Sequence, residues 1–282
     1  MEHSDQVTRG ERFAFGRNWE QFLKSVNRSR VAEAERSLQS MLGLNDLTNK
    51  TFLDIGCGSG LFSLAARQLG AEVHSFDYDP QSVACTRELK RRFFPQDEVW
   101  KIDEASALDS EYVTNTGTFD IVYSWGVLHH TGDMSRALRN AAIPVKIGGL
   151  LFVAIYNDQD QASKVWKQIK KMYCSGTIGR TVVRAVFLPY FIAESLAIGL
   201  IKYGNPMGHI RAYKRNRGMS IYYDAVDWLG GYPFEVARPE GIVRFYTTAG
   251  FELRNLTTTN RRGCNQYVFQ KTGLPQRTGE VL

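Results

Sequence analysis

A glycine-rich run with an acidic residue near its start has the clearest chemical character in this sequence. Residues 53–60 read LDIGCGSG, and the run contains Asp54, Gly56, Cys57, Gly58 and Gly60. Glycines let a chain turn sharply and approach a ligand closely, and the start of a following helix offers unpaired backbone N–H groups. The run therefore predicts a ligand-binding turn between a strand and a helix, and the alternative is a tight turn that binds nothing.

The glycine spacing indicates which ligand such a turn would bind. Gly56, Gly58 and Gly60 form Gly-x-Gly-x-Gly, whereas the dinucleotide-binding fingerprint is Gly-x-Gly-x-x-Gly. The carboxylate of Asp54 would repel a phosphate, but it suits a ligand that carries an ammonium and a sulfonium. We therefore expect a cationic small ligand rather than a pyrophosphate.

A second acidic anchor follows about 20 residues later. Asp77 stands at the end of a predicted strand, where a carboxylate can accept hydrogen bonds from both hydroxyls of a ribose. Asp79 precedes Pro80, the pairing typical of a helix N-cap and its first residue. We assign ribose binding to Asp77 and a structural role to Asp79.

Two adjacent histidines, His129 and His130, follow another predicted strand. Histidine titrates near neutral pH, so either ring could accept a proton from a substrate. We prefer His130 as the base; in the competing interpretation one ring packs inward and the other caps a helix or faces solvent. His74 lies inside a strand and is expected to be a core residue.

An aromatic stretch at residues 221–234 could hold the substrate. Its aromatic and acidic side chains suit stacking against a small molecule with a few polar contacts. The predicted substrate-binding residues are Tyr156, Tyr223, Asp227, Trp228 and Tyr232. The competing interpretation is that these rings form the ordinary core of a small helical cap.

Strands must alternate with helices to position these residues. Short apolar runs at 52–55, 73–76, 99–102, 119–124 and 150–156 predict five strands with helical patterns between them, which implies parallel pairing in a doubly wound α/β sheet. Residues 239–249 have a helical period, and 251–256 with 266–269 predict an antiparallel hairpin. At the N-terminus, residues 13–19 lead into a helix that runs toward Leu42.

The long interval between the fifth strand and the last helix predicts an insertion. Its first part, 165–173, is amphipathic, and residues 182–201 are the most apolar stretch of the chain. Arg184, Pro189, Glu194 and Ser195 interrupt that stretch, which argues against a membrane span. We consider three roles for it, in order of preference: the core of the cap, a homodimer contact, or a passage for a lipid-like acceptor.

Composition excludes several protein classes. With 282 residues, 43% of them hydrophobic and 23% charged, the chain has ordinary globular usage rather than the composition of a disordered or fibrous protein. Four scattered cysteines, Cys57, Cys85, Cys174 and Cys264, predict neither disulfides nor a metal site. The first residues lack the pattern of a secretory signal, so we expect a cytoplasmic location without integral membrane association. The net charge of +6 is modest.

Three stretches and the closing hairpin resemble the class I S-adenosylmethionine-dependent methyltransferases. The stretches are LDIGCGSG, SFDYDP and FDIVYSWGVLHH, and the resemblance, strongest to the branch with ubiquinone-biosynthesis O-methyltransferases, covers roughly 51–155 and 239–271. It implies a Rossmann-like methyltransferase fold: a doubly wound seven-stranded mixed sheet with its last strand inserted antiparallel. Around it we expect a helical segment over the cofactor site (1–50), the cofactor-binding core (51–156), an inserted helical cap (157–238), and a final helix with the hairpin (239–282).

The resemblance also implies a cofactor, S-adenosyl-L-methionine, and roles for residues around it. Gly56, Gly58 and Gly60 would line its methionine moiety, Asp77 would hold the ribose, and Tyr78 would pack on the adenine. The family usually has an Asp after the third strand, but residues 104–107 read EASA here. The adenine contact therefore falls to Ser106 and backbone groups, and Ser124 and Trp125 would lie beside the methyl group.

The methyl acceptor can be narrowed by what the sequence lacks. Enzymes that methylate amino groups of nucleic-acid bases resemble one another in an Asn/Asp-Pro-Pro-aromatic motif after the fourth strand, and residues 124–127 read SWGV. We expect transfer to an oxygen, less readily to a nitrogen, of an aromatic, glycan or amphiphilic small molecule. The alternatives are an RNA methyltransferase that uses the basic clusters, or a non-catalytic regulatory subunit that binds the cofactor.

Overall fold

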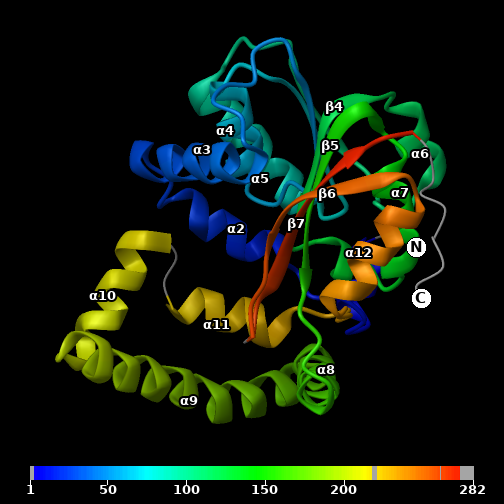
Figure 1. Ribbon diagram of the computed structural model, residues 1–282. Coiled ribbons are helices and arrows are strands. Elements are labelled where there is room, and N and C mark those ends of the chain that lie inside the picture. Colours follow the sequence, from blue (N-terminus) through cyan, green and yellow to red (C-terminus); the bar gives the residue numbers. More distant parts are fainter. Residues whose placement is uncertain (1–2, 218–220, 261, 274–282) are drawn as a thin grey trace, which may run out of the picture.

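A seven-stranded sheet organises the chain, and helices cover both of its faces (Figure 1). The computed structural model describes residues 3–217, 221–260 and 262–273. The strand order is β3-β2-β1-β4-β5-β7-β6. The strands are β1 (Thr51–Ile55), β2 (Glu72–Asp77), β3 (Trp100–Glu104), β4 (Phe119–Trp125), β5 (Val145–Tyr156), β6 (Phe251–Thr257) and β7 (Cys264–Lys271).

The predicted doubly wound mixed sheet is confirmed. Strands β1 to β5 pair in parallel, and β7 pairs antiparallel with both β5 and β6. Strand β7 is therefore the single antiparallel member, inserted between β5 and β6 as the resemblance implied. The largest difference from the predicted strand bounds is in β5. This strand begins at Val145, five residues before the predicted Leu150, and therefore includes Gly148 and Gly149.

Two apolar cores lie on opposite faces of the sheet. Alternate residues of β1 divide between them: Phe52 packs with the core that contains Leu64 of α4, and Leu53 with the core that contains Tyr246 of α12. This alternation follows from the two-residue period of a strand. The helices of the sheet region are α4 (Leu61–Gln68), α5 (Pro80–Phe93), α6 (Ser110–Asn115), α7 (Met134–Ala142), α12 (Pro239–Thr248) and the 3-10 turn η1 (Leu128–His130).

The N-terminal region contains three helices, α1 (His3–Thr8), α2 (Gly16–Leu23) and α3 (Arg28–Leu42). The predicted single helix toward Leu42 is therefore wrong. Asn27 has extended backbone angles and its side chain accepts a hydrogen bond from Arg30 N at 3.1 Å, so it begins a new helix instead of continuing α2. Helix α3 then packs along α4, which directly follows the glycine-rich turn.

Four helices form the insertion beyond the carboxyl end of β5: α8 (Gln161–Cys174), α9 (Thr177–Tyr203), α10 (Pro206–Arg217) and α11 (Ile221–Gly230) (Figure 1). The core shared by α8, α9 and α11 includes Tyr173, Val183, Phe191 and Leu229. Among the described residues, α9 is the one helix long and apolar enough to cross a membrane by length and composition, and only 17% of its most apolar window is buried.

The Asn27 cap gives a stability prediction. Asn27→Ala removes the acceptor for Arg30 N, so the free energy of unfolding should fall by about 1 kcal/mol. Asn27→Ser keeps a capping oxygen and should remain close to the wild-type value. Urea unfolding followed by circular dichroism measures both variants, and equal losses for the two would contradict the assigned cap.

Candidate functional site

The glycine-rich turn after β1 is held against the end of β2. Gly56, Gly58 and Gly60 all have positive φ angles, of 77°, 55° and 80°, a backbone region that side chains with a Cβ rarely adopt. Gly58 N donates a hydrogen bond of 2.9 Å to the Asp77 carboxylate. The turn therefore needs its glycines for its conformation and Asp77 for its position.

Two acidic residues, Asp77 and Asp79, lie at the carboxyl end of β2 and form different hydrogen bonds. Asp77 accepts a second hydrogen bond from Asp79 N at 2.9 Å, and burial raises its pKa to about 6. Asp79 caps α5 by accepting from Gln81 N at 2.9 Å. The prediction that Asp79 caps a helix is confirmed, and Asp77 lies beside the glycine turn.

Three of the predicted cofactor residues have their side chains occupied inside the protein. Asp54 is buried and accepts a hydrogen bond from Ser63 of α4, and burial raises its pKa to about 7. Ser124 is buried and donates to Ile55 O at 2.9 Å. The Cys57 thiol is buried beside Thr86 Oγ1 at 3.2 Å. These three buried side chains therefore stabilise the turn from the interior of the protein.

The N-terminal segment covers the turn from the other side. A Cβ built on Gly58 would lie 3.1 Å from Trp19 Nε1, and Gly16 N donates to Asp79 Oδ2 at 2.8 Å. The Arg12 guanidinium lies 5.1 Å from the centre of the Tyr78 ring. It also donates to the carbonyls of His130 at 2.8 Å and Thr131 at 3.1 Å. Arg12, which sequence reasoning missed, thus connects the end of β2 with the histidine turn.

The two histidines form hydrogen bonds that assign different tautomers to their rings. His130 Nδ1 lies 2.7 Å from Pro233 O, so Nδ1 carries the hydrogen and the lone pair is on Nε2. His129 Nδ1 accepts from Tyr156 N at 3.4 Å, which leaves the hydrogen on Nε2. That Nε2 is buried without a hydrogen-bond partner among the described residues. The rings lie 4.4 Å apart between centres.

Burial keeps both imidazoles neutral. It lowers the pKa of His129 well below its usual range and that of His130 to about 3, the latter against the opposing effect of the bond to Pro233 O. Both rings therefore remain uncharged at neutral pH. One offers a lone pair and the other an N–H group.

An aromatic cluster joins the histidines to the inserted helices. The Tyr156 ring lies 4.0 Å from His129, 5.2 Å from Trp228 and 5.5 Å from Phe234 between ring centres. Lys170 of α8 ends inside this cluster, with Nζ 4.2 Å from the Trp228 ring centre and 4.8 Å from that of Phe234. Its side chain is fully buried, and burial lowers its pKa to about 7.

Sequence reasoning missed Lys170 because a lysine on an amphipathic helix is usually solvent-exposed. Its position relative to Trp166 and Tyr173, four residues before and three after it, was an available signal because these spacings place all three on one helix face. A cation on the inward face of a helix otherwise lined by rings indicates a buried charge.

The remaining predicted residues have more peripheral positions. Ser106 accepts from Leu108 N at 3.1 Å within the loop after β3. Trp125 is 42% exposed and its Nε1 donates to Gln266 at 3.3 Å. Asp227 accepts from Asn18 at 2.5 Å, and Tyr232 O accepts from Phe13 N at 2.8 Å, so both bind the N-terminal segment. Tyr223 belongs to α11, but its side chain lies outside the described residues.

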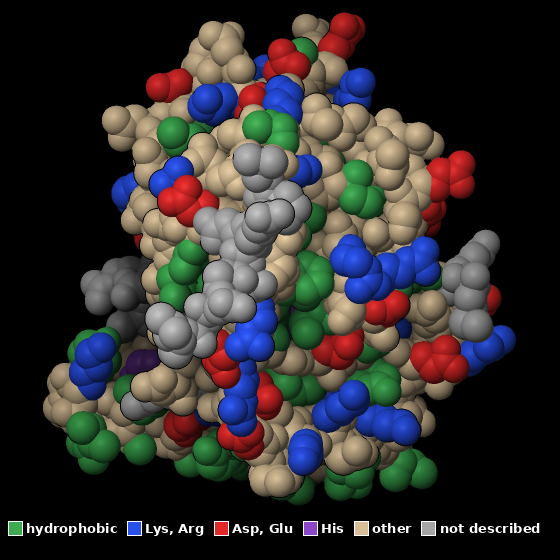
Figure 2. Space-filling model, turned by 45° about the vertical axis from the view of Figure 1, so that its right-hand side comes forward, with side chains coloured by type: hydrophobic (Ala, Val, Ile, Leu, Met, Phe, Trp, Pro, Cys, Tyr) green, Lys and Arg blue, Asp and Glu red, His purple; other side chains and the backbone are tan. Residues whose placement is uncertain are grey.

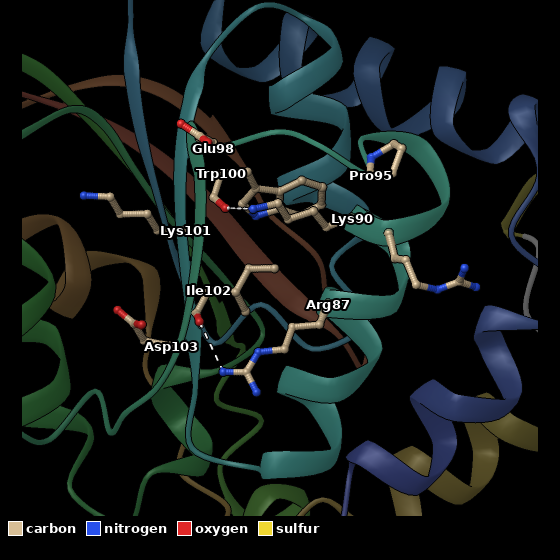
Figure 3. Close-up of a pocket in the computed structure, with 9 residues that line it drawn as sticks. Arg87, Lys90, Pro95, Glu98, Trp100, Lys101, Ile102 and Asp103 are labelled. Carbon is tan, nitrogen blue, oxygen red and sulfur yellow. Dashed lines mark hydrogen bonds between the residues drawn. The ribbon is translucent and has the colours of Figure 1, made fainter.

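A hollow of about 460 Å³ lies elsewhere, between α5 and β3 (Figure 3). Three of its four cations already have internal partners: Arg87 donates to Ile102 O at 3.4 Å, Lys90 donates to Trp100 O, and Arg91 forms an ion pair with Glu88. Most of the groups that recognition of an anion would require are therefore engaged. We place the candidate site at the glycine turn and the histidine cluster instead.

Comparison with known proteins identifies the family of this chain. The family described as methyltransferase domain matches residues 26–215, more than half of the chain, and this region includes the glycine turn, Asp77 and both histidines. The chain belongs to this methyltransferase-domain family. Membership confirms the resemblance seen in the sequence.

Relatives of this methyltransferase-domain chain include two proteins named ubiquinone biosynthesis O-methyltransferase. The one from Xanthomonas oryzae pv. oryzae (strain PXO99A) is 33% identical over 112 residues, which cover 40% of this chain and 45% of the relative. The one from Methylobacterium sp. (strain 4-46) is 30% identical over 116 residues, covering 41% and 45%. The match thus spans less than half of either relative's length.

Solved structures show the same fold at low identity. PKMT2 from Rickettsia typhi, in complex with AdoHcy, has a TM-score of 0.56 and 14% identity, with 86% of this chain and 53% of that one covered. An O-methyltransferase family protein from Burkholderia thailandensis has a TM-score of 0.52 and 14% identity, with 86% and 57% covered. These likenesses extend to most of the chain and support the methyltransferase fold.

The buried lysine gives a pH prediction. Above about pH 7 the folded chain loses the Lys170 proton, whereas the unfolded chain keeps it up to about 10.5. The free energy of unfolding should therefore rise across that interval, by at most about 1.4 kcal/mol per pH unit from this group. Lys170→Met should remove this rise, and Lys171→Met, at an exposed neighbour, should keep it. Urea unfolding at pH 7, 8 and 9 measures it; identical slopes in wild type and Lys170→Met would contradict the buried state.

Proposed function

We propose that this protein uses S-adenosyl-L-methionine to methylate an oxygen of a small aromatic or amphiphilic molecule. The observation that carries the proposal is the proximity of two structures: the glycine turn with Asp77, and the neutral His130 whose Nε2 lone pair adjoins a ring cluster. Val127 links them, since a Cβ on Gly56 would lie 2.3 Å from its side chain and its carbonyl accepts from His130 N.

The residues at the glycine turn have the chemistry that this cofactor requires. The Asp77 carboxylate can accept hydrogen bonds from the ribose hydroxyls, and Tyr78 offers a flat ring beside it for the adenine. The positive-φ glycines would let the methionine moiety approach the backbone. When bound, the cofactor supplies an activated methyl group, so this chain must provide alignment and proton removal.

The segment before α3 contributes to the same site in our proposal. It covers the glycine turn through Trp19 and reaches Asp79 through Gly16 N. It also contacts the inserted helices through the bond from Asn18 to Asp227. A segment that contacts both the glycine turn and the inserted helices would exclude water from the site once the ligands are bound. Exclusion of water strengthens electrostatic interactions within the site.

The two histidines would then have different roles toward the acceptor. The Nε2 lone pair of His130 accepts the hydroxyl proton only as the methyl group is transferred, because burial lowers the pKa of the ring to about 3 and disfavours its protonated form beforehand. Its Nδ1–H stays bonded to Pro233 O, which fixes the ring. The unpartnered Nε2–H of His129 can donate to the acceptor oxygen and hold it in line with the methyl group. Positioning of this kind contributes about 7 to 11 kcal/mol in favourable cases.

Lys170 and the rings around it would hold the acceptor's body. Tyr156, Trp228 and Phe234 present aromatic surfaces, and the Lys170 amine adds one polar group among them. The names of the relatives, ubiquinone biosynthesis O-methyltransferase, favour a hydroxyl-bearing ring as acceptor. All four cysteines are free thiols, which supports our proposal of a reducing, cytoplasmic compartment.

Cofactor binding tests the first half of the proposal. Asp77→Ala removes the ribose acceptor and the partner of Gly58 N, so the affinity for S-adenosylmethionine should fall by at least about 100-fold. Glu72→Gln, at the exposed opposite end of β2, is the control and should bind as the wild type does. Isothermal titration calorimetry measures both; unchanged affinity in Asp77→Ala would remove the carboxylate from the site.

The turnover rate tests the proposed role of His130 as the base. His130→Gln should lower kcat by about 10² to 10⁴ while leaving cofactor affinity intact. His74→Gln alters a histidine that pairs with Asp103 and should turn over at the wild-type rate. Methyl incorporation into a panel of phenols, measured by mass spectrometry, reads both. A wild-type rate in His130→Gln would exclude it as the base, and methylation of RNA alone would overturn the small-molecule acceptor.

A further inference from the structure

Helix α9 exposes an apolar stripe along most of its length. Ile178, Val182, Val186, Pro189, Ala193 and Leu200 are exposed to solvent and follow one another at intervals of three, four or seven residues. These intervals place them on one face of a helix, about 33 Å long at 1.5 Å per residue. Ile178 is 82% exposed and Val186 59%.

The charged residues of α9 do not interrupt this stripe. At 100° per residue, Arg180, Arg184, Glu194 and Lys202 all lie on other faces of the helix. Two of them are engaged within the protein: Arg184 donates to the Tyr173 hydroxyl at 2.9 Å, and Glu194 pairs with Arg262. The outward face is therefore continuously apolar, while the inward face packs against α8 and α11. Contiguous apolar surface of this extent marks an interaction site.

The helices around the stripe account for the chain's net positive charge. Residues 161–217 contain eleven Lys and Arg and a single acid, Glu194, whereas the rest of the chain has 24 basic and 28 acidic residues. Of the eleven, the exposed ones with described side chains are Lys164, Lys167, Lys171, Arg180, Lys202 and Arg211. Figure 2 shows Lys and Arg side chains just above the hydrophobic lower edge of the molecule.

This charge decides between two possible occupants of the stripe. In a symmetric dimer the same patch would face itself, so two segments of net charge +10 would lie against each other and repel. A bilayer with anionic headgroups complements both features, since its acyl boundary accepts the apolar face and its phosphates attract the flanking cations. Nucleic acid would match the charge but not the apolar stripe.

We propose that α9 lies in the plane of an anionic membrane surface, with its apolar stripe at the acyl boundary and the cations of α8 to α10 among the headgroups. The helix does not cross the bilayer in this arrangement, because its inward face remains in the core that contains Val183 and Phe191. This inference rests on the surface of α9 and not on the proposed methyl transfer.

Vesicle co-sedimentation with the full chain tests the proposal. Wild-type protein should pellet with vesicles of phosphatidylcholine and phosphatidylglycerol in equal parts, and about tenfold or more weakly with phosphatidylcholine alone. Val186→Asp should lower partitioning by about tenfold or more. Ile147→Asp, at a 69% exposed position on β5 far from α9, is the matched control and should bind as the wild type does.

A charge pair of variants separates the electrostatic contribution. Lys164→Gln with Lys167→Gln should lower partitioning by about fivefold for each charge removed. Lys24→Gln with Lys101→Gln removes two exposed cations elsewhere and should have little effect. Val182→Ser with Val186→Ser provides a milder apolar test, and far-UV circular dichroism verifies that each variant is folded.

Three outcomes would overturn the proposal. The first is wild-type protein that stays in the supernatant with anionic vesicles. The second is equal binding by Val186→Asp and Ile147→Asp. The third is a wild-type dimer in light scattering that does not bind vesicles and that Val186→Asp dissociates. This result would assign the stripe to contact with a second copy of the chain. Cofactor affinity of Val186→Asp should equal that of wild type, so failure here is distinguishable from failure of the proposed function.

Discussion

The Asp77 carboxylate lies at the carboxyl end of β2, and the hydrogen bonds that stabilise it there fix the loops around it. It accepts from Gly58 N, which sets the position of the glycine turn, and from Asp79 N, which starts the next loop. Asp79 in turn caps α5 and accepts from Gly16 N of the N-terminal segment. Burial of an anion is costly unless backbone N–H groups surround it. Two neighbouring carboxylates, Asp77 and Asp79, therefore connect three segments that are distant in the sequence.

The glycine turn and the hydrogen bonds around Asp77 and Asp79 were predictable because local sequence determines them. A Gly-x-Gly-x-Gly run between a strand and a helix, an Asp at the end of the next strand, and an Asp-Pro cap each require only a few neighbouring residues. The parallel strands and the closing hairpin followed from short apolar runs for the same reason. The break between α2 and α3 was not predicted, although Asn27 is of a residue type preferred at helix N-caps and disfavoured inside helices.

The cluster of Lys170, the two histidines and the surrounding rings was less predictable because residues from distant segments meet there. Lys170 becomes a buried amine only when Trp228 and Phe234, about 60 residues later, close around it. The tautomers of His129 and His130 depend on Tyr156 N and Pro233 O, which sequence spacing does not reveal. The apolar stretch at 182–201 was expected first as the core of the cap. Helix α9 buries Val183 and Phe191 there and partly buries Phe187 and Leu188, but it exposes the opposite face.

The inserted helices combine two unlike environments within a short distance. On the side of the sheet, Lys170 and both histidines are so well enclosed that desolvation favours their neutral forms and lowers their pKa values. On the outer side, α9 leaves apolar residues in contact with solvent while exposed lysines flank them. Both arrangements cost stability in an isolated protein in water, because apolar groups are exposed and titratable groups are buried. A ligand inside and a partner surface outside would each relieve one of these costs, which is why we assign function to both sides of the insertion.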